Sequence, residues 1–142
     1  MNPLNCCTLP AAKRLHEAGL LKRDPEIGDR VSVDCEDDRH EGFVINQEAF
    51  GVEVRFDDCE ETSWMDSYAV TILYAFAEVW RELPESIIDS GTAYFLKLMT
   101  VLGTTVAGYF SNGCSIKDFK SQNPTDALIA LLIWPRGRKE AV

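Results

Sequence analysis

Eight carboxylates in two short clusters are the residues best suited to chemistry in this sequence. They are Asp34, Glu36, Asp37 and Asp38 in the first cluster, and Asp57, Asp58, Glu60 and Glu61 in the second. Carboxylates gathered in this way attract cations, so the clusters predict a surface that binds a basic protein or peptide. Their spacing lacks the alternating ligands and the glycine of a calcium loop, and we assign no metal and no cofactor. Asp57 and Asp58 point to opposite faces of a strand and do not form a catalytic carboxylate pair.

The acidity belongs to one segment of the chain. Residues 28–66 hold thirteen acidic and three basic residues, a formal charge of −10, while the remainder holds ten acidic and eleven basic residues, a charge of +1. This balance disfavours direct binding to nucleic acid, which depends on clustered Lys and Arg. The segment could instead imitate the charge spacing of DNA phosphates and occupy a nuclease. We expect a non-enzymatic interaction module whose clustered carboxylates, Asp57 included, can be reversed to Lys without loss of the fold.

An aromatic set offers a second kind of site. Phe50, Trp64 and Tyr68 could form a pocket that holds a methylated Lys or Arg by cation–π attraction. The alternative is structural, with Phe43 and Phe56 filling a barrel core and Trp64 covering its end. The sequence leaves both interpretations open.

Catalytic and metal-binding patterns are weak. His16 lies on the polar side of a predicted helix and His40 in a charged turn, and neither has an evident nucleophile as a partner. Cys35, His40 and Cys59 lack the closely spaced ligand pairs of a zinc site. The five cysteines follow no disulfide framework, there is no secretory signal, and no apolar run approaches the roughly 20 residues of a membrane helix. We therefore expect a cytoplasmic protein with reduced thiols and no enzyme activity.

The segment that carries the clusters alternates apolar and polar residues with a period of two. Strands are predicted around residues 31–33, at 42–46, at 51–56, at 60–65 and at 69–73. Five short strands joined by charged or glycine-containing turns predict a small closed barrel over residues 27–73. A helix over residues 8–21 and a polar linker to residue 26 precede it.

Residues 74–142 predict a second unit with the order α-β-β-β-α. A helix is expected at residues 76–83, strands at 93–100, 105–111 and 115–119, and a final helix capped by Asn123. We expect a three-stranded antiparallel sheet with both helices on one face, and hence an α+β fold class. This order is also similar to double-stranded RNA-binding domains, which leaves nucleic-acid binding as an alternative. The bases available for it are Lys97, Lys117, Lys120, Arg136, Arg138 and Lys139.

Residues 28–73 resemble an SH3-like barrel of the Tudor type. The resemblance rests on an opening GDRVSV, a second strand GFV, a third strand VEVRF, and FDDCEETSW before a closing AVTIL. Tudor domains carry a phrase such as F-x-D-Y-G-N after the third strand, and residues 56–60 occupy that place. The resemblance implies a reader of cationic or methylated peptides.

The flanking segments resemble small uncharacterised proteins encoded by phages and mobile elements of bacteria. The phrases that carry this likeness are CCTLPAAKRLHEAGL, YAFAEVWRELPESI and NPTDALIALLIW, although Pro135 ends the last helix early. The likeness implies that the barrel is inserted between two parts of one host domain. It supplies no activity.

Overall fold

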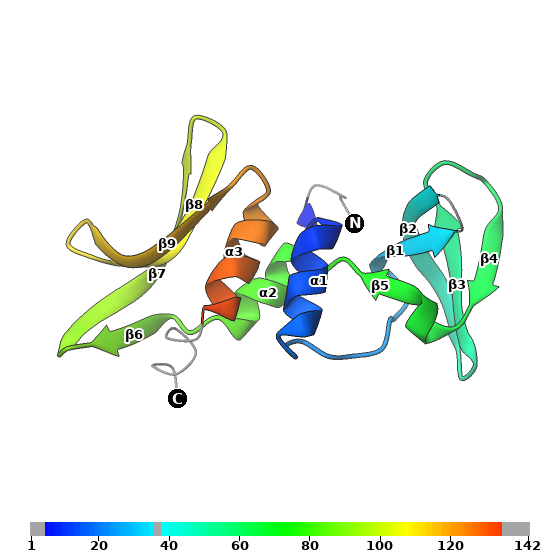
Figure 1. The fold of residues 1–142 in the computed structure, drawn as a ribbon, viewed down its shortest axis with the longest axis horizontal. Coiled ribbons are helices and arrows are strands. Elements are labelled where there is room, and N and C mark those ends of the chain that lie inside the picture. The colour runs from blue at the N-terminus through cyan, green and yellow to red at the C-terminus, as the bar shows by residue number, and fades with distance from the viewer. Residues whose placement is uncertain (1–4, 36–37, 135–142) are drawn as a thin grey trace. The chain divides into compact units, whose positions relative to one another are not determined.

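The computed structural model describes residues 5–35 and 38–134 of the 142-residue chain. The chain divides into two compact units, Met1–Tyr74 and Ala75–Val142. Each unit contains one antiparallel sheet and at least one α-helix, which confirms the α+β class (Figure 1). Among the described residues, no helix has both the length and the apolar character needed to cross a membrane.

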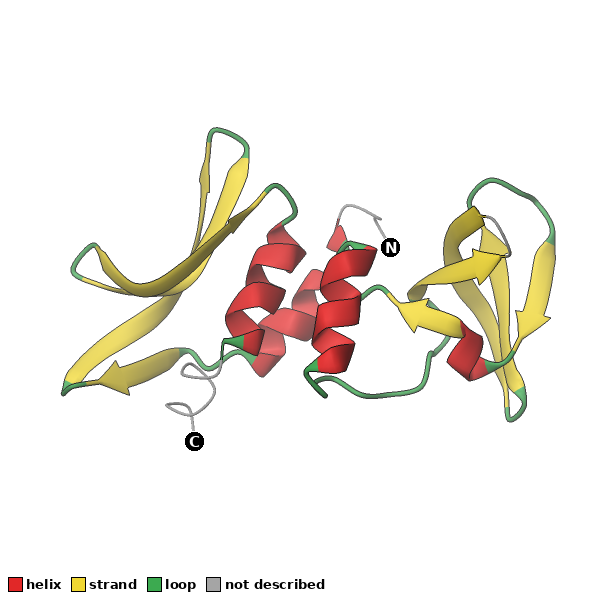
Figure 2. Cartoon of the chain, in the orientation of Figure 1, coloured by secondary structure: helices red, strands yellow, loops and turns green. Residues whose placement is uncertain are grey.

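The first unit places one helix before a curled five-stranded sheet (Figure 2). Its elements are α1 (Leu9–Glu17), β1 (Arg30–Cys35), β2 (Asp38–Glu48), β3 (Gly51–Phe56), β4 (Thr62–Met65), the 3₁₀ helix η2 (Ser67–Ala69) and β5 (Val70–Ile72). The strand order is β4-β3-β2-β1-β5, and every adjacent pair is antiparallel. All five predicted strands are present. Helix α1 is shorter than predicted, and Gly19 follows it with a left-handed φ of +74°.

Alternating valines build the core of this sheet. The inward-facing residues are Val31, Val33, Val44, Val52, Val54 and Val70, with Phe56 and Met65 packed against them. A strand exposes successive side chains on opposite faces, so this pattern fixes which face is buried. Gly42 belongs to the same face, where a Cβ would lie 2.3 Å from the Arg55 carbonyl oxygen.

Phe43 departs from the expected core. It pairs with Arg30 on one side and Arg55 on the other, on the face opposite the valines. The guanidinium carbon of Arg30 lies 4.7 Å from the centre of the Phe43 ring. The core prediction is therefore correct for Phe56 and wrong for Phe43, because a β-branched neighbour, Val44, takes the inward position.

Arg30 is the buried charge of this unit. Its side chain is only 6% exposed. One guanidinium nitrogen, Nη1, donates to Asp57 Oδ1 at 2.9 Å, while Nη2 donates to Asp57 Oδ2 and, at 3.1 Å, to Glu41 Oε1. A buried cation is tolerated only with such partners, and the two-pronged geometry matches a guanidinium to a carboxylate. The hydrogen bonds with Asp57 raise the pKa of Arg30 and lower the pKa of Asp57.

The second unit contains one strand more than predicted. Its elements are α2 (Phe76–Glu82), β6 (Ser86–Asp89), β7 (Thr92–Val101), β8 (Thr104–Ser111), β9 (Cys114–Ser121) and α3 (Pro124–Ile133). The sheet order is β6-β7-β8-β9, so the three-stranded αβββα prediction is wrong. Strand β6 has only four residues and follows Pro84 closely, and its turn residues, Ser90 and Gly91, give a weaker signal than Asn-Gly.

Three two-residue turns connect the strands of this sheet. The turns are Ser90-Gly91, Leu102-Gly103 and Asn112-Gly113, and all six residues have positive φ. Positive φ at both turn positions matches the right-handed twist of the flanking strands, and it gives tight hairpins. The last two turns join the strands that the sequence predicts at residues 93–100, 105–111 and 115–119.

Helix α3 covers one face of this sheet. It contacts β8 and β9, and α2 packs against it. The predicted cap is present, because the Asn123 Oδ1 atom accepts a hydrogen bond from the Asp126 backbone nitrogen at 3.1 Å. Beneath the helix, the fully buried Tyr109 donates its hydroxyl to the Pro84 carbonyl at 2.8 Å.

The Arg30–Asp57 contact generates a pH-dependent prediction. At neutral pH we expect Asp57→Asn to lower the free energy of unfolding by about 2 kcal/mol, because the buried guanidinium loses its main partner. The folded-state pKa of Asp57 lies below 3.8, the value of an unperturbed aspartate. Its contribution is therefore complete above that value and is lost as the pH falls through the lowered pKa. Urea unfolding at a series of pH values should show the two proteins converging in acid.

Asp58→Asn is the matched control for this experiment. The contact of Asp58 with His40 is partly exposed, so removing it should cost less than about 1 kcal/mol. Equal losses in the two variants at neutral pH, or an Asp57→Asn deficit that stays constant into acid, would contradict the buried role of Arg30.

Candidate functional site

The sheet brings the described residues of the two acidic clusters together, with Asp34 on β1, Asp38 on β2 and the second cluster after β3. The first cluster ends at Asp38, which opens β2, and the second begins directly after β3. The Asp57 backbone nitrogen donates to the Glu41 carbonyl at 3.0 Å. The His40 Nδ1 atom lies 2.8 Å from the Asp58 carboxylate, in a hydrogen bond. His40, which lacked a partner in the sequence, therefore fastens the β3–β4 loop to β2.

The predicted acidic residues have different roles in the structure. Asp57 holds Arg30. In contrast to the tolerance predicted from the sequence, we therefore expect its reversal to Lys to destabilise the fold. Asp34 accepts a hydrogen bond from Arg39 Nε at 3.0 Å in an exposed pair. Glu36 and Asp37 lie outside the described residues.

Five carboxylates form what we call the acidic end of the curled five-stranded sheet. They are Asp34, Asp38, Asp58, Glu60 and Glu61, all of them exposed. Within the described part of the chain, no ion pair engages Asp38, Glu60 or Glu61. No described cation therefore neutralises these three carboxylates, and they are available to a ligand.

A hollow lies beside the acidic end. Its volume is about 510 Å³, and its lining residues are Phe43, Arg55, Phe56, Asp57, Cys59 and Glu60. Phe43, on the face opposite the valines, offers apolar surface in this lining, and Glu60 offers a carboxylate. Arg55 contributes the opposite charge. This combination suits the aliphatic stem of a basic side chain better than a free cation.

The structure brings two of the three predicted pocket aromatics into contact. The Phe50 and Trp64 rings lie 5.1 Å apart at 41° to each other. They are 67% and 42% exposed. Phe50 lies in the turn after β2, and Trp64 lies on β4, an edge strand. Tyr68 is 88% exposed on η2 and lines a different pocket.

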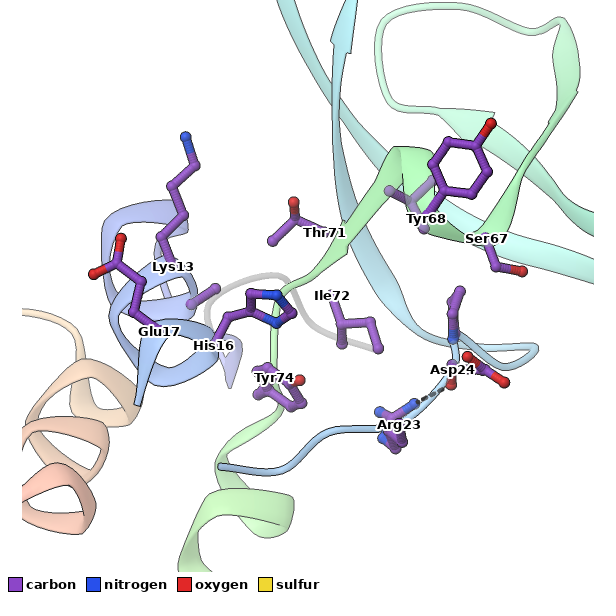
Figure 3. Close-up of a pocket in the computed structure, with 13 residues that line it drawn as sticks. Lys13, His16, Glu17, Arg23, Asp24, Ser67, Tyr68, Thr71, Ile72 and Tyr74 are labelled. Carbon is purple, nitrogen blue, oxygen red and sulfur yellow. Dashed lines mark hydrogen bonds between the residues drawn. The ribbon is translucent and has the colours of Figure 1, made fainter. Parts of the chain in front are cut away.

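That other pocket was not predicted. It lies between α1, the linker and the η2–β5 segment, and its volume is about 670 Å³ (Figure 3). His16 points into it. The Tyr74 hydroxyl closes its base by donating to the Leu21 carbonyl at 2.8 Å. Residues more than 50 positions apart in the chain build this pocket. A local sequence pattern does not predict contacts between residues so far apart.

The chemistry available in this pocket is limited. Ser67 and Thr71 supply hydroxyl groups, but no hydrogen bond between described residues joins either one to His16. Arg23 is held by a two-pronged contact to Asp29, at 2.6 Å and 2.9 Å. His16 therefore activates neither of these two hydroxyl groups in this geometry.

Thiols and metal-ligating groups are dispersed. Cys6 and Cys7 are buried, and Cys59 and Cys114 are exposed. Burial raises the pKa of Cys6. The side chain of Cys35 lies outside the described residues. Across residues 5–35 and 38–134, no three His, Cys, Asp or Glu side chains come together as metal ligands.

Comparison with protein-family models, with curated proteins and with solved structures finds no match for this chain. The candidate site is therefore defined by its own geometry. That geometry consists of the acidic end, the hollow beside it, and the exposed pair of Phe50 and Trp64.

Proposed function

We propose that this protein is a non-enzymatic interaction module that binds a basic segment of another protein through the acidic end of its five-stranded sheet. One observation carries the proposal. The contacts His40–Asp58 and Arg30–Asp57 fasten the second acidic loop beside the first, while Glu60 and Glu61 stay exposed on it. The DNA-binding groove of a nuclease is one basic surface that this end could occupy.

The connectivity of the sheet supports the Tudor-type resemblance. In SH3-like barrels the strand order is β4-β3-β2-β1-β5, with a 3₁₀ helix before the last strand, and this chain has the same order and a 3₁₀ helix at η2. Small barrels of this kind serve widely as binding modules. Fold alone does not assign a ligand, so the proposal rests on the charges of the acidic end.

The expected complex is weak and sensitive to salt. Each exposed ion pair contributes roughly 0.2–1 kcal/mol, so several must act together. The Debye length is about 10 Å at 0.1 M salt, and added salt screens exposed pairs of this kind. The hollow beside Glu60 adds contacts for an aliphatic stem, which favours Lys and Arg side chains over inorganic cations.

Charge reversal at the acidic end tests the proposal. The variant Asp38→Lys/Glu60→Lys/Glu61→Lys leaves Asp57 and Asp58 in place, and with them the contacts that hold the loop. We expect it to bind a fluorescent Lys-rich peptide at least about tenfold more weakly, equivalent to about 1.4 kcal/mol, by fluorescence anisotropy. Binding of the wild type should weaken as salt rises.

A second triple variant controls for net charge. Glu26→Lys/Glu82→Lys/Glu85→Lys changes the formal charge by the same amount at exposed positions that do not belong to the acidic end. It should keep most of the affinity. If both variants lose affinity equally, binding follows the overall charge of the protein and the proposed site is wrong. If only the variant of the acidic end loses affinity, capture from a lysate at two salt concentrations would identify the physiological partner.

The contact between Phe50 and Trp64 favours a second candidate, a reader of methylated lysine. An exposed aromatic pair offers ring faces to a cation, and Glu53 lies opposite Trp64 on the neighbouring strand. This candidate predicts a saturable change in Trp64 fluorescence with a trimethyl-lysine peptide, at an affinity several-fold above that for the unmodified peptide.

Trp64→Phe identifies the source of that signal, because the chain also contains Trp80 and Trp134. The variant should lose the fluorescence change. Equal affinity for the methylated and unmodified peptides would exclude the reader function and leave the acidic end as the binding site.

A further inference from the structure

Within the described part of the second unit, the four-stranded sheet has an apolar face opposite the one that α3 contacts through β8 and β9. Alternation along the strands separates its residues into two sets. The inner set includes Ala107 and Tyr109, which are fully buried, and the Tyr109 ring lies 6.5 Å from the ring of Trp134 at the end of α3. The outer set includes Ile88, Phe95, Met99, Val101, Val106 and Phe110. We call this second set the outer face.

The outer face is partly exposed and poorly suited to water, because Val106 at its centre is only 8% exposed while several other large side chains face solvent. Ile88 is 61% exposed, Phe95 is 60% exposed and Val101 is 54% exposed. A solvent-facing side of an antiparallel sheet normally carries polar residues in alternation with a buried apolar side. Here both sides are apolar along β7 and β8. A contiguous apolar surface of this kind marks an interaction site.

The outer face carries three charged side chains, Lys97 of β7 and Asp118 and Lys120 of β9, and the Ser115 hydroxyl donates a hydrogen bond to Asp118. The register places Lys97 of β7, Gly108 of β8 and Asp118 of β9 in one row across the sheet. The centre of the row is therefore a residue without a side chain, flanked by one cation and one anion. Phe110 and Val106 lie on either side of Gly108 along β8 and share its face.

We propose that a second copy of this chain covers the outer face, related by a two-fold axis that runs parallel to β8 over Gly108. This rotation places Lys97 of each copy over Asp118 of the partner subunit. It also places Phe110 and Val106 against their own symmetry mates. A two-fold axis directed across the strands would instead place Lys97 against Lys97 of the partner subunit, which is repulsive. The positions of Lys97 and Asp118 therefore favour the axis parallel to β8 over the axis across the strands.

The available area predicts a reversible dimer. Four strands spaced about 4.8 Å apart and about eight residues long, at about 3.3 Å per residue, present a face on the order of 500 Å². Two such faces bury on the order of 1,000 Å², at the lower end of specific interfaces. We therefore expect a dissociation constant on the order of 10 µM. The two sheets would pack about 10 Å apart.

Sedimentation equilibrium of the full chain tests the dimer, between about 1 µM and about 200 µM. The wild type should shift from monomer to dimer across this range. Lys97→Glu and Asp118→Lys should each weaken the dimer at least about tenfold, because each places like charges opposite one another. An equimolar mixture of the two single variants should restore dimerisation, since both cross-subunit contacts then join opposite charges.

The equimolar mixture distinguishes the loss of an intersubunit contact from a folding defect, because mixing two misfolded variants would not restore the dimer. Lys117→Glu is the control, because Lys117 lies on β9 with its side chain on the opposite face, and this variant should dimerise like the wild type. Circular dichroism checks the fold of each variant. A wild type that stays monomeric at about 200 µM would overturn the proposal, and so would single variants that fail to recover on mixing.

Discussion

The first unit depends on one buried cation and the carboxylate that neutralises it. Arg30 lies at the start of β1 with a nearly inaccessible side chain, and Asp57 lies just after β3. Their two-pronged contact ties these strands together across β2, where Glu41 adds a third hydrogen bond. Removing Asp57 would leave a charge in a poorly solvated site, so the β3–β4 loop has to stay close to the sheet.

This constraint changes the meaning of the acidic composition. Part of the charge is structural, since Asp57 and Glu41 serve Arg30 and Asp34 serves Arg39. The remainder, represented by Asp38, Glu60 and Glu61, is exposed and available for a ligand. The proposed binding surface is therefore smaller than the sequence clusters, but the buried contact beside it gives it a defined position. The apolar outer face of the second unit is a separate surface with a different physical basis.

Local patterns in the sequence predicted most of the fold. Alternating valines determine the inner face of the first sheet, and Asn123 marks the start of α3 because its side chain caps the helix. The sequence did not indicate β6, which is too short for alternation to be visible. It also misplaced Phe43, since stacking beneath Arg30 offers an aromatic ring an alternative to the core.

The candidate site was less predictable than the fold, because it depends on contacts between distant residues. Charge counting found the two clusters but could not separate Asp57 from Glu60, which differ only in their partners. The pocket beside α1 and the register that aligns Lys97 with Asp118 also require tertiary structure. The local sequence around these residues does not indicate that they lie close together in the fold.

The most direct measurement of the central contact is a carbon-detected NMR titration of the Asp57 carboxyl group. The structure predicts a midpoint below 3.8, the value of an unperturbed aspartate, because protonation must break the hydrogen bonds from Arg30. A midpoint at or above that value would show that Asp57 does not neutralise Arg30. The position of the acidic end would then have no structural basis.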